Sequence, residues 1–433
     1  MRIAIIGGGW AGLAAAVRAL DRGHLVTLLE MAPSLGGRAR TVQQHGQHFD
    51  NGQHILIGAY TQTLALMRQV GADPARLLRR LPLSLTRPDG TGLALTCRSS
   101  AASFAWAVLR HSHWHWRSRL AMLKASAGWA ARGFECPADW TVEVLTKALP
   151  LEVRQELVEP LCVAALNTPA QTASARVFLR VLKDALMQQV GGADLLLPVR
   201  PLDDLLPESG LSWLRTHGAD IRLRCRARDV APLRSGWMVD TEAFDQVILA
   251  CPAQEAARLT RACNPAWSAT AAQLTHSAIT TVYLTCAGAR LARPMVFLPE
   301  GPAQFAFDHR AMGLGQNRFA FVISAADDMQ HLNRNQLAQS VLDQALHQFP
   351  AGTWPAPLQV SGVFTERRAT FRCEPTAQRP AAAVAPGLWA AGDYVEGPYP
   401  STLEGAVRSG QEAADLAHQA FAMQNRAPRR DSP

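Results

Sequence analysis

The sequence predicts an α/β protein in which separated chain segments build one parallel sheet and the remaining segments form a second, mixed α+β domain. Three observations support this fold class. A short apolar run over residues 2–6 is followed by glycines and a helix rich in small residues. A second apolar run, residues 25–29, comes after that helix. Near the other end, residues 388–391 lead through a glycine into a further helix rich in small residues. Apolar runs that alternate with helices are typical of a parallel sheet.

The first unit is a strand, a glycine turn, a helix over Leu13 to Leu20, and a second strand that ends on Glu30. In the turn, Gly7 permits a tight bend, Gly9 lets the backbone approach a pyrophosphate, and Gly12 lets the helix pack closely on the sheet. The helix N-terminus offers N–H groups to phosphates, and Glu30 is placed to accept hydrogen bonds from a ribose hydroxyl. This order predicts a Rossmann-like dinucleotide site.

Two further segments favour FAD as the dinucleotide, and the carboxylate of Glu30 disfavours the 2′-phosphate of NADP. In the segment 34–39, Gly36 and Gly37 allow the chain to pass close to a ligand, and Arg38 can neutralise phosphate charge. The second segment is the C-terminal unit described next.

The C-terminal unit contains a strand, then Gly392 and Asp393, then a loop and a helix. We expect Asp393 to bond the ribityl hydroxyls. A helix that begins near Thr402 and Leu403 would point its positive end at the isoalloxazine or the pyrophosphate.

These motifs resemble those of the FAD-dependent amine-oxidase and phytoene-desaturase superfamily over essentially the whole chain. The resemblance implies that FAD is the cofactor. It also matches Val230 to a valine whose backbone pairs with the adenine edge. A narrower string, FDNGQHILIGAY at residues 49–60, resembles the hydroxysqualene dehydroxylases, also called squalene-associated FAD-dependent desaturases. The residues matched to FAD contacts are Gly7, Gly9, Gly12, Glu30, Gly36, Gly37, Arg38 and Asp393.

The narrower resemblance implies an oxidoreductase of squalene and hopanoid biosynthesis. Reduced FAD would give a hydride to the carbon of hydroxysqualene that loses its hydroxyl as water, yielding squalene. We expect a general acid to assist the leaving group. His54 is one candidate because histidine can donate a proton near neutral pH, and Tyr399, before the closing helix, is the other. Their alternative roles are to orient the 50–54 loop and to form an aromatic wall beside the flavin.

Other functions stay open at this point. The same fold run oxidatively would be a carotenoid or phytoene-type desaturase, which would form new conjugated double bonds. A non-catalytic lipid carrier on the same scaffold would not need flavin. Amine oxidation is less favoured because the Gln53-His54 string resembles another branch.

The composition bounds these alternatives. The chain has 433 residues, enough for two domains, and 48% of them are hydrophobic. Eight cysteines without CxxC spacing argue against a zinc site or a disulfide framework and favour a cytoplasmic protein. The histidines at 111, 113 and 115 have no evident third ligand, so we expect no metal site. We also expect neither a signal peptide, since the first strand begins at residue 2, nor a spanning segment.

Positive charge is concentrated in one region. The net charge is +8, but residues 76–132 hold ten basic residues and one acidic residue, an excess of 10 − 1 = +9. Tryptophans at 106, 114, 116 and 129 lie in the same region. Interleaved tryptophans and cations over 104–134 suit a membrane–water interface, so we expect peripheral association with the inner face of a membrane. The alternative is a helix pair with aromatic residues in the core and solvated arginines. No motif indicates nucleic-acid binding or identifies the reductant of FAD.

We expect the FAD-binding domain to be built from residues 1–75, 195–254 and 355–424. Its middle piece should contain a helix over 201–214 and a strand over 227–233. Residues 76–194 and 255–354 should form the domain for a long-chain isoprenoid substrate and the membrane. Residues 425–433 are typical of a disordered tail.

Overall fold

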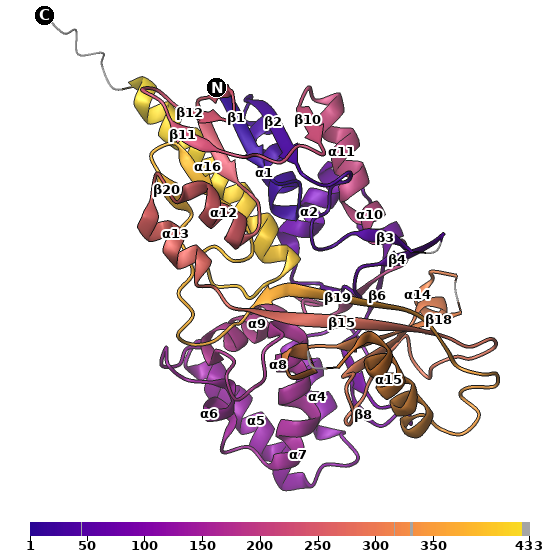
Figure 1. The fold of residues 1–433 in the computed structure, drawn as a ribbon. Helices are drawn as coiled ribbons and strands as arrows, with labels where there is room; N and C mark the ends of the chain where they lie inside the picture. Colours follow the sequence, from indigo (N-terminus) through magenta and orange to yellow (C-terminus); the bar gives the residue numbers. More distant parts are fainter. Residues whose placement is uncertain (45, 316, 330–331, 427–433) are drawn as a thin grey trace, which may run out of the picture.

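A six-stranded sheet lies in the upper half of the molecule in Figure 1. The computed structural model describes residues 1–44, 46–315, 317–329 and 332–426. The strand order is β10-β2-β1-β14-β21-β20, and only the β20–β21 pair is antiparallel. These strands come from the beginning, middle and end of the chain, which confirms a Rossmann-like α/β sheet built from discontinuous segments. They are β1 (Arg2–Ile6), β2 (Leu25–Glu30), β10 (Asp220–Leu223), β14 (Gln246–Leu249), β20 (Ala383–Ala385) and β21 (Leu388–Ala390).

The first and last helices pack against each other beside this sheet. They are α1 (Trp10–Asp21) and α16 (Leu403–Arg426). A Cβ atom on Gly410 would lie 2.1 Å from the Ala11 carbonyl oxygen, so the two backbones approach as closely as glycine allows. Arg18 donates to both carboxylate oxygens of Asp415 at 2.9 Å. The two chain ends are therefore joined by packing and by an ion pair. Because α16 continues to Arg426, only residues 427–433 of the expected tail lie outside the described residues.

The middle piece of the FAD-binding region differs from its predicted boundaries. The helix expected over 201–214 is two helices, α10 (Leu202–Leu205) and α11 (Pro207–Thr216), because Pro207 has no N–H to continue the first one. The strand expected over 227–233 is shortened to β11 (Val230–Pro232), which pairs with β12 (Trp237–Val239). β13 (Glu242–Phe244), α12 (Ala253–Thr260) and α13 (Pro265–Ala272) complete this piece.

A second sheet is antiparallel and has the order β16-β17-β18-β15-β19. Its strands β15 and β19 cross the middle of Figure 1, below the parallel sheet. Sequence analysis assigned residues 355–371 to the FAD-binding domain, but β19 pairs with β15 along most of its length. The members are β15 (His276–Thr285), β16 (Met295–Phe297), β17 (Phe305–Asp308), β18 (Arg318–Ile323) and β19 (Gln359–Phe371), with α15 (Arg334–Gln348) packed on β15 and β19.

Residues 101–187 form a helical lobe at the bottom of Figure 1. Its helices are α4 (Ala101–Leu109), α5 (Trp116–Ala131), α6 (Val142–Thr146), α7 (Leu151–Val153), the π-helix η1 (Arg154–Val158), α8 (Glu159–Leu166) and α9 (Ala175–Met187). No helix within the described ranges is long and apolar enough to cross a bilayer. The remaining short elements are β3 (Thr41–Gln44), β4 (Gln47–Asp50), β5 (Leu56–Ile57), α2 (Thr61–Gln69), α3 (Pro74–Leu77), β6 (Leu78–Leu81), β7 (Ser84–Thr86), β8 (Gly92–Ala94), β9 (Leu195–Pro198), α14 (His309–Met312) and the 3₁₀ helix η2 (Ala326–Met329).

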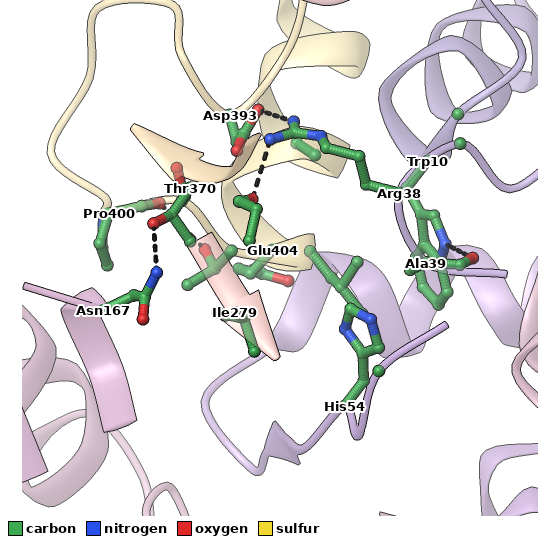
Figure 2. A pocket seen from close by; sticks show the side chains of 18 of the residues that line it. Trp10, Arg38, Ala39, His54, Asn167, Ile279, Thr370, Asp393, Pro400 and Glu404 are labelled. Carbon is green, nitrogen blue, oxygen red and sulfur yellow. Dashed lines mark hydrogen bonds and ion pairs between the residues drawn. The ribbon is translucent and has the colours of Figure 1, made fainter. Parts of the chain in front are cut away.

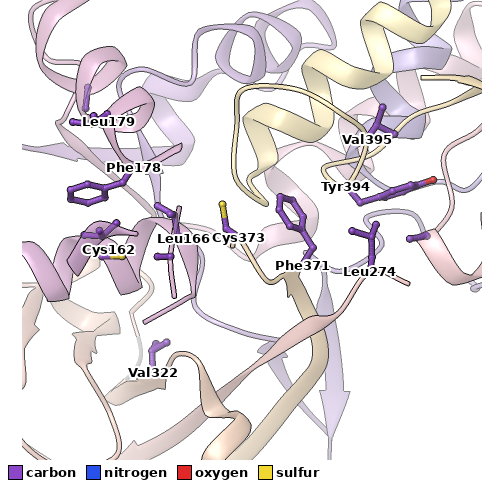
Figure 3. Packing of buried hydrophobic residues seen from close by; sticks show 14 of the residues in the cluster. Cys162, Leu166, Phe178, Leu179, Leu274, Val322, Phe371, Cys373, Tyr394 and Val395 are labelled. Atoms are coloured by element: carbon purple, nitrogen blue, oxygen red, sulfur yellow. The ribbon is translucent and has the colours of Figure 1, made fainter. Parts of the chain in front are cut away.

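One hydrophobic core joins the lobe to the C-terminal part of the chain. Figure 3 shows Cys162, Leu166 and Phe178 of the lobe on one side and Phe371 and Cys373 on the other, and all are buried. The backbone also connects them, because the amide of Ser174 donates to the Cys373 carbonyl at 2.7 Å. The lobe is thus held firmly beside the segment that leads into the closing motif.

Candidate FAD and substrate site

Two glycine loops meet at the carboxyl end of β1. The amide of Gly36 donates to the Gly8 carbonyl at 2.9 Å, and Gly9 and Gly36 form a parallel bridge. A Cβ atom on Gly37 would lie 3.1 Å from the Gly9 Cα atom, and Gly37 has φ = +64°. A side chain at Gly9 would meet no atom closer than 3.8 Å, so the space beside it is open. The loops therefore form a backbone-lined cradle of the kind that a pyrophosphate requires.

Gly7 and Gly12 act through packing. Gly7 has φ = +112°, and a Cβ atom there would lie 2.5 Å from the Ala250 carbonyl oxygen. A Cβ atom on Gly12 would lie 1.9 Å from the Gly7 carbonyl oxygen. Gly7 lines the cavity described below, whereas Gly12 does not. Gly12 therefore supports the cradle from behind, by holding α1 against the turn.

Glu30 is held rigidly at the end of β2. Its carboxylate accepts hydrogen bonds from the amides of Gly8 at 2.6 Å and Ala32 at 2.7 Å. It also lines the cavity. Each carboxylate oxygen keeps a second acceptor position, so Glu30 fits the predicted contact with a ribose hydroxyl.

Arg38 and Asp393 form an ion pair across the cavity edge (Figure 2). Arg38 also donates to the Ala369 carbonyl at 3.0 Å. Burial would raise the pKa of Asp393, but the charge of Arg38 and its hydrogen bond hold that pKa below its usual value. Sequence analysis had given each residue a separate contact with the cofactor. The structure instead pairs them, because a buried carboxylate needs a nearby cation.

The closing motif brings α16 to the cavity. Gly392 has φ = +154°, and a Cβ atom there would lie 2.6 Å from the Tyr394 ring, so only glycine fits. The Thr402 hydroxyl caps the helix by accepting from the Gly405 amide at 3.0 Å. Gly392, Thr402 and Leu403 line the cavity, as does the first turn of α16. The positive end of that helix is therefore directed at the cavity wall, as predicted for a flavin or phosphate contact.

Glu404, in the first turn of α16, is a residue that sequence analysis missed. Its buried carboxylate accepts from the Gln62 and Thr63 amides at 3.1 and 2.9 Å and from Arg408 at 2.7 Å. These bonds fasten α2 to α16. An acid in the first turn of a helix was the available signal, since it faces the positive end of the dipole.

The adenine contact predicted for Val230 is wrong in position. The backbone of Val230 is paired with Val239, its side chain is buried in the core, and it does not line the cavity. Residues 225–227 line the cavity instead, and the Cys225 amide donates to the Glu30 carbonyl at 2.9 Å. The part of this segment that lines the cavity thus ends at Ala227, three residues before Val230.

The cavity has a volume of about 840 Å³ and extends from the cradle into the lobe and the antiparallel sheet. Its far part is largely apolar, with side chains from four regions of the chain. They are Leu83, Leu85, Phe104, Leu161, Phe178, Val181, Leu182, Leu186, Met295, Phe305, Phe307 and Val322.

His54 lines the cavity below Arg38 and beside Ile279 (Figure 2). Burial, and next the charge of Arg38, lower the pKa of His54 to about 4. The imidazole is therefore neutral near pH 7. This differs from the expected role of His54 as a proton donor, because an imidazolium is disfavoured in this environment.

Tyr399 lines the cavity between two guanidinium groups. Arg180 donates to its hydroxyl at 3.0 Å. The guanidinium Cζ atoms of Arg180 and Arg408 lie 5.1 and 5.3 Å from the centroid of the Tyr399 ring. Burial, and next the charge of Asp184, raise the pKa of Tyr399. The phenol therefore keeps its proton at neutral pH, in contrast to His54.

Asp184 is a second residue that sequence analysis missed. It lies on α9, lines the cavity with a nearly buried side chain, and accepts from Arg180 at 3.0 Å. An arginine and an acid four residues apart on a lobe helix resemble an ordinary surface pair. Only the fold shows that this pair meets Tyr399.

The tryptophans of residues 104–134 divide into two groups. Trp114 and Trp129 are buried, and Trp114 donates to Glu156 at 2.8 Å. They belong to the core, so the expected interface function does not extend to them. Trp106 and Trp116 are exposed. His111 is buried and stacks on Trp114, and no group of three possible metal ligands occurs in the described part of the chain.

The fold and the cradle define a flavin oxidoreductase, and the comparisons with known proteins agree. A model of the flavin containing amine oxidoreductases matches residues 10–418. The chain belongs to this family, and its cofactor is FAD.

Three relatives illustrate the similarity. Hydroxysqualene dehydroxylase of Zymomonas mobilis is 28% identical over 446 residues, which cover 95% of this chain and 98% of the relative. Zeta-carotene desaturase of Zea mays is 38% identical over 92 residues, which cover 21% of this chain and 16% of the relative. The structure of an oxidoreductase from Methanosarcina mazei shares the fold with a TM-score of 0.71 and 15% identity, covering 96% of this chain and 100% of that one.

Proposed function

We propose that this FAD-dependent oxidoreductase reduces hydroxysqualene to squalene, with loss of the hydroxyl as water. The observation that carries the proposal is a continuous cavity that joins the cradle to an apolar chamber and has the protonated phenol of Tyr399 on its wall. The near full-length similarity to a relative named hydroxysqualene dehydroxylase supports the choice of substrate.

The apolar chamber suits the two long arms of an isoprenoid. Such arms carry no polar group, so recognition depends on shape and on apolar contact. Phe104 and Phe178 of the lobe and Phe305 and Phe307 of the sheet supply broad apolar surfaces for this contact. The same side chains exclude water from the reacting carbon.

The cradle residues would hold the cofactor and set its position. The backbone at Gly9 and Gly37 would bind the pyrophosphate, Glu30 would bind the ribose, and the start of α16 would stabilise charge at the flavin end. When bound in its reduced form, FAD supplies the hydride for the substrate carbon that loses its oxygen.

Tyr399 protonates the leaving hydroxyl. Arg180 donates to the phenol oxygen, and the phenol O–H donates to the Asp184 carboxylate, so the hydroxyl must turn from Asp184 to the leaving oxygen when substrate binds. The C–O bond breaks, a C–H bond forms, and the proton from Tyr399 completes the water. Arg180 and Arg408, on either side of the ring, stabilise the phenolate that remains. Asp184 fixes Arg180 in place.

His54 orients the loop between β4 and β5 against the cofactor and does not supply the proton. Its neutral imidazole at the cavity wall fits this positioning role.

The decisive experiment is an anaerobic single turnover. Reduced, FAD-loaded protein is mixed with hydroxysqualene, the flavin absorbance is followed, and the products are identified by mass spectrometry. We expect one squalene for each flavin oxidised. Retained FAD without squalene and without flavin oxidation would refute the proposal.

A desaturase is the second candidate function, supported by the similarity to zeta-carotene desaturase. Oxidised protein is incubated with phytoene, and the absorbance of conjugated double bonds is recorded. Conjugated products in this assay, with no squalene in the first, would establish the desaturase. A lipid carrier would bind squalene without any change in the flavin.

We further propose that the protein works on the inner face of the cytoplasmic membrane, where its isoprenoid substrate dissolves. The surface that makes this contact is argued next.

A further inference from the structure

The lobe carries exposed apolar side chains on α4 and on α5, and Arg119 of α5 donates to the Leu109 carbonyl at the end of α4 at 3.0 Å. Trp106 and Leu109 of α4 are 54% and 48% exposed, and Trp116 and Leu120 of α5 are 59% and 42% exposed. We infer that this face, called the lobe face below, docks on a bilayer that contains anionic phospholipid.

Helical spacing separates the lobe face from the core. In α4, Phe104 and Val108 are buried, while Trp106 and Leu109 point outward. In α5, Trp116, Leu120 and Lys124 recur every four residues and are all exposed. Each helix thus has one side in the core and one unpartnered side with large apolar groups.

The positive charge of residues 98–134 favours an anionic partner for the lobe face. Residues 98–134 contain six basic residues and no acidic residue, counted in the sequence: Arg98, Arg110, Arg117, Arg119, Lys124 and Arg132. Arg110 lies 5.3 Å from the Trp106 ring centroid, and Arg117 lies 5.5 Å from the Trp116 ring centroid. Within the described ranges neither arginine has a carboxylate partner.

A ring with a cation beside it matches the headgroup region of a bilayer. The ring enters the boundary of the acyl chains and the cation meets a lipid phosphate. A partner that offers only phosphates, such as a nucleic acid, would leave Leu109 and Leu120 without an apolar environment. The combination therefore favours anionic lipid.

The lobe face lies close to the cavity. Phe104 and Leu186 line the cavity, whereas Trp106 and Met187, nearby in sequence, are exposed. Arg98 donates to the Val190 carbonyl at 3.1 Å, which brings the start of α4 next to the end of α9. Residues of both helices thus face the cavity on one side and the outside on the other. Entry of a bilayer-dissolved substrate here rests on the proposed function, but docking itself does not.

Vesicle flotation tests the inference without any turnover. FAD-loaded full-length protein is floated with vesicles of phosphatidylcholine alone or mixed with phosphatidylglycerol. Charge reversal in Arg110→Glu/Arg117→Glu should weaken binding to the mixed vesicles by on the order of tenfold or more. Trp106→Ala/Trp116→Ala should weaken it by about tenfold. The matched control Leu346→Ala removes an equally exposed side chain from α15 and should bind like the wild type.

Flavin absorbance confirms that each variant is folded. Equal flotation of both double variants and the wild type would overturn the inference. So would binding of duplex DNA that matches the vesicle binding and is lost in the arginine variant alone. Squalene formation from detergent-dissolved hydroxysqualene is measured in parallel, so that failed docking and failed chemistry are distinguished.

Discussion

The FAD cradle and the helical lobe are built on different principles. In the cradle, backbone atoms pack against backbone atoms, and a Cβ at Gly7 or Gly12 would overlap a carbonyl oxygen. In the lobe, apolar side chains such as Phe178 and Leu166 pack against each other, and similar volumes would serve. The cradle can therefore be recognised from glycines at fixed positions in the sequence. The lobe requires only that its core residues are apolar, so no such motif marks it. Cofactor chemistry can be read from such a chain more readily than substrate chemistry.

The largest effect should come from Gly12→Ala. The new Cβ would lie 1.9 Å from the Gly7 carbonyl oxygen, so α1 must move and the cradle must open. We expect a loss of at least about 3 kcal/mol in the free energy of unfolding, and loss of FAD. Urea unfolding and flavin absorbance measure the two effects.

Gly9→Ala is the matched control for the cradle. Its Cβ would have no neighbour within 3.8 Å except Gly37, so the apoprotein should keep its stability within about 0.5 kcal/mol. FAD affinity should still fall, because the Cβ enters the ligand space. Equal loss of stability in both variants would contradict the division between packing and ligand-facing glycines.

Tyr399→Phe tests the point where cradle and lobe meet. Removal of the phenol proton should slow flavin oxidation in a single turnover by at least about a hundredfold, with FAD still bound. His54→Gln should slow it by less than about tenfold, since the imidazole is already neutral. The reverse ranking of the two variants would assign the proton to His54.

Asp393→Asn tests the buried ion pair of the cradle. Arg38 would lose its partner but is partly exposed, so we expect a loss of about 2 kcal/mol in unfolding free energy. The folded pKa of Asp393 is depressed, so its contribution is present above its ordinary pKa and is lost as the pH falls below it. Unfolding at pH 7 and pH 3 should therefore differ less in the variant. Glu242→Gln, which breaks the exposed pairs of Glu242 with Arg2 and Arg222, is the control and should cost less than about 1 kcal/mol.

The pH dependence of apoprotein stability should reflect the titration of His54, which is partly buried at the cavity wall. Its folded pKa of about 4 lies below the ordinary histidine pKa of 6.5, so the unfolded chain takes up the proton first. The contribution of the neutral His54 to the free energy of unfolding is complete above pH 6.5 and is lost as the pH falls toward 4. His54→Gln should reduce the fall between pH 7 and pH 5 by about 1–2 kcal/mol, measured by urea unfolding. An unchanged slope would place His54 in contact with solvent.

The smallest effect should come from the lobe face. Trp106→Ala removes a ring that is more than half exposed, so unfolding free energy should change by no more than about 0.5 kcal/mol. Vesicle binding is the property that it should alter. A stability loss above about 1 kcal/mol would show that the ring belongs to the core.

The glycine turns could be located from local motifs because each glycine there meets a steric requirement of its own short segment. Gly7 and Gly9 lie in the turn after β1 and Gly36 and Gly37 in a second short turn after β2, and all four line the cavity. The Val230 assignment missed by three residues because the start of the hairpin β11–β12 is set by its pairing with Val239. The boundary near residue 355 was wrong because only pairing with β15 shows where β19 belongs.

Long-range pairs were not predictable from the sequence. Arg38 and Asp393 are 355 residues apart, and each lies in a motif that suggests a ligand contact. Asp184 and Tyr399 come together only because α9 packs beside the closing segment. When two charged residues far apart in the sequence are brought together only by the fold, the local sequence around each of them does not indicate the pair.

The closing segment contains one more arrangement, centred on Arg379. Its guanidinium donates to the backbone carbonyls of residues 393, 394, 395, 397 and 399, with distances of 2.7 Å to Asp393 and Tyr399 and 2.8 Å to Gly397. Five donors meet five acceptors, so the guanidinium is fully satisfied.

The segment 393–399 is therefore wound around a single cation. An exposed stretch with Gly397 and a proline beside it would ordinarily tolerate added residues. Here an insertion would break a closed ring of carbonyls and would shift Asp393 and Tyr399 together. Chain length in this stretch should thus be as strictly constrained as residue identity is in the glycine turn.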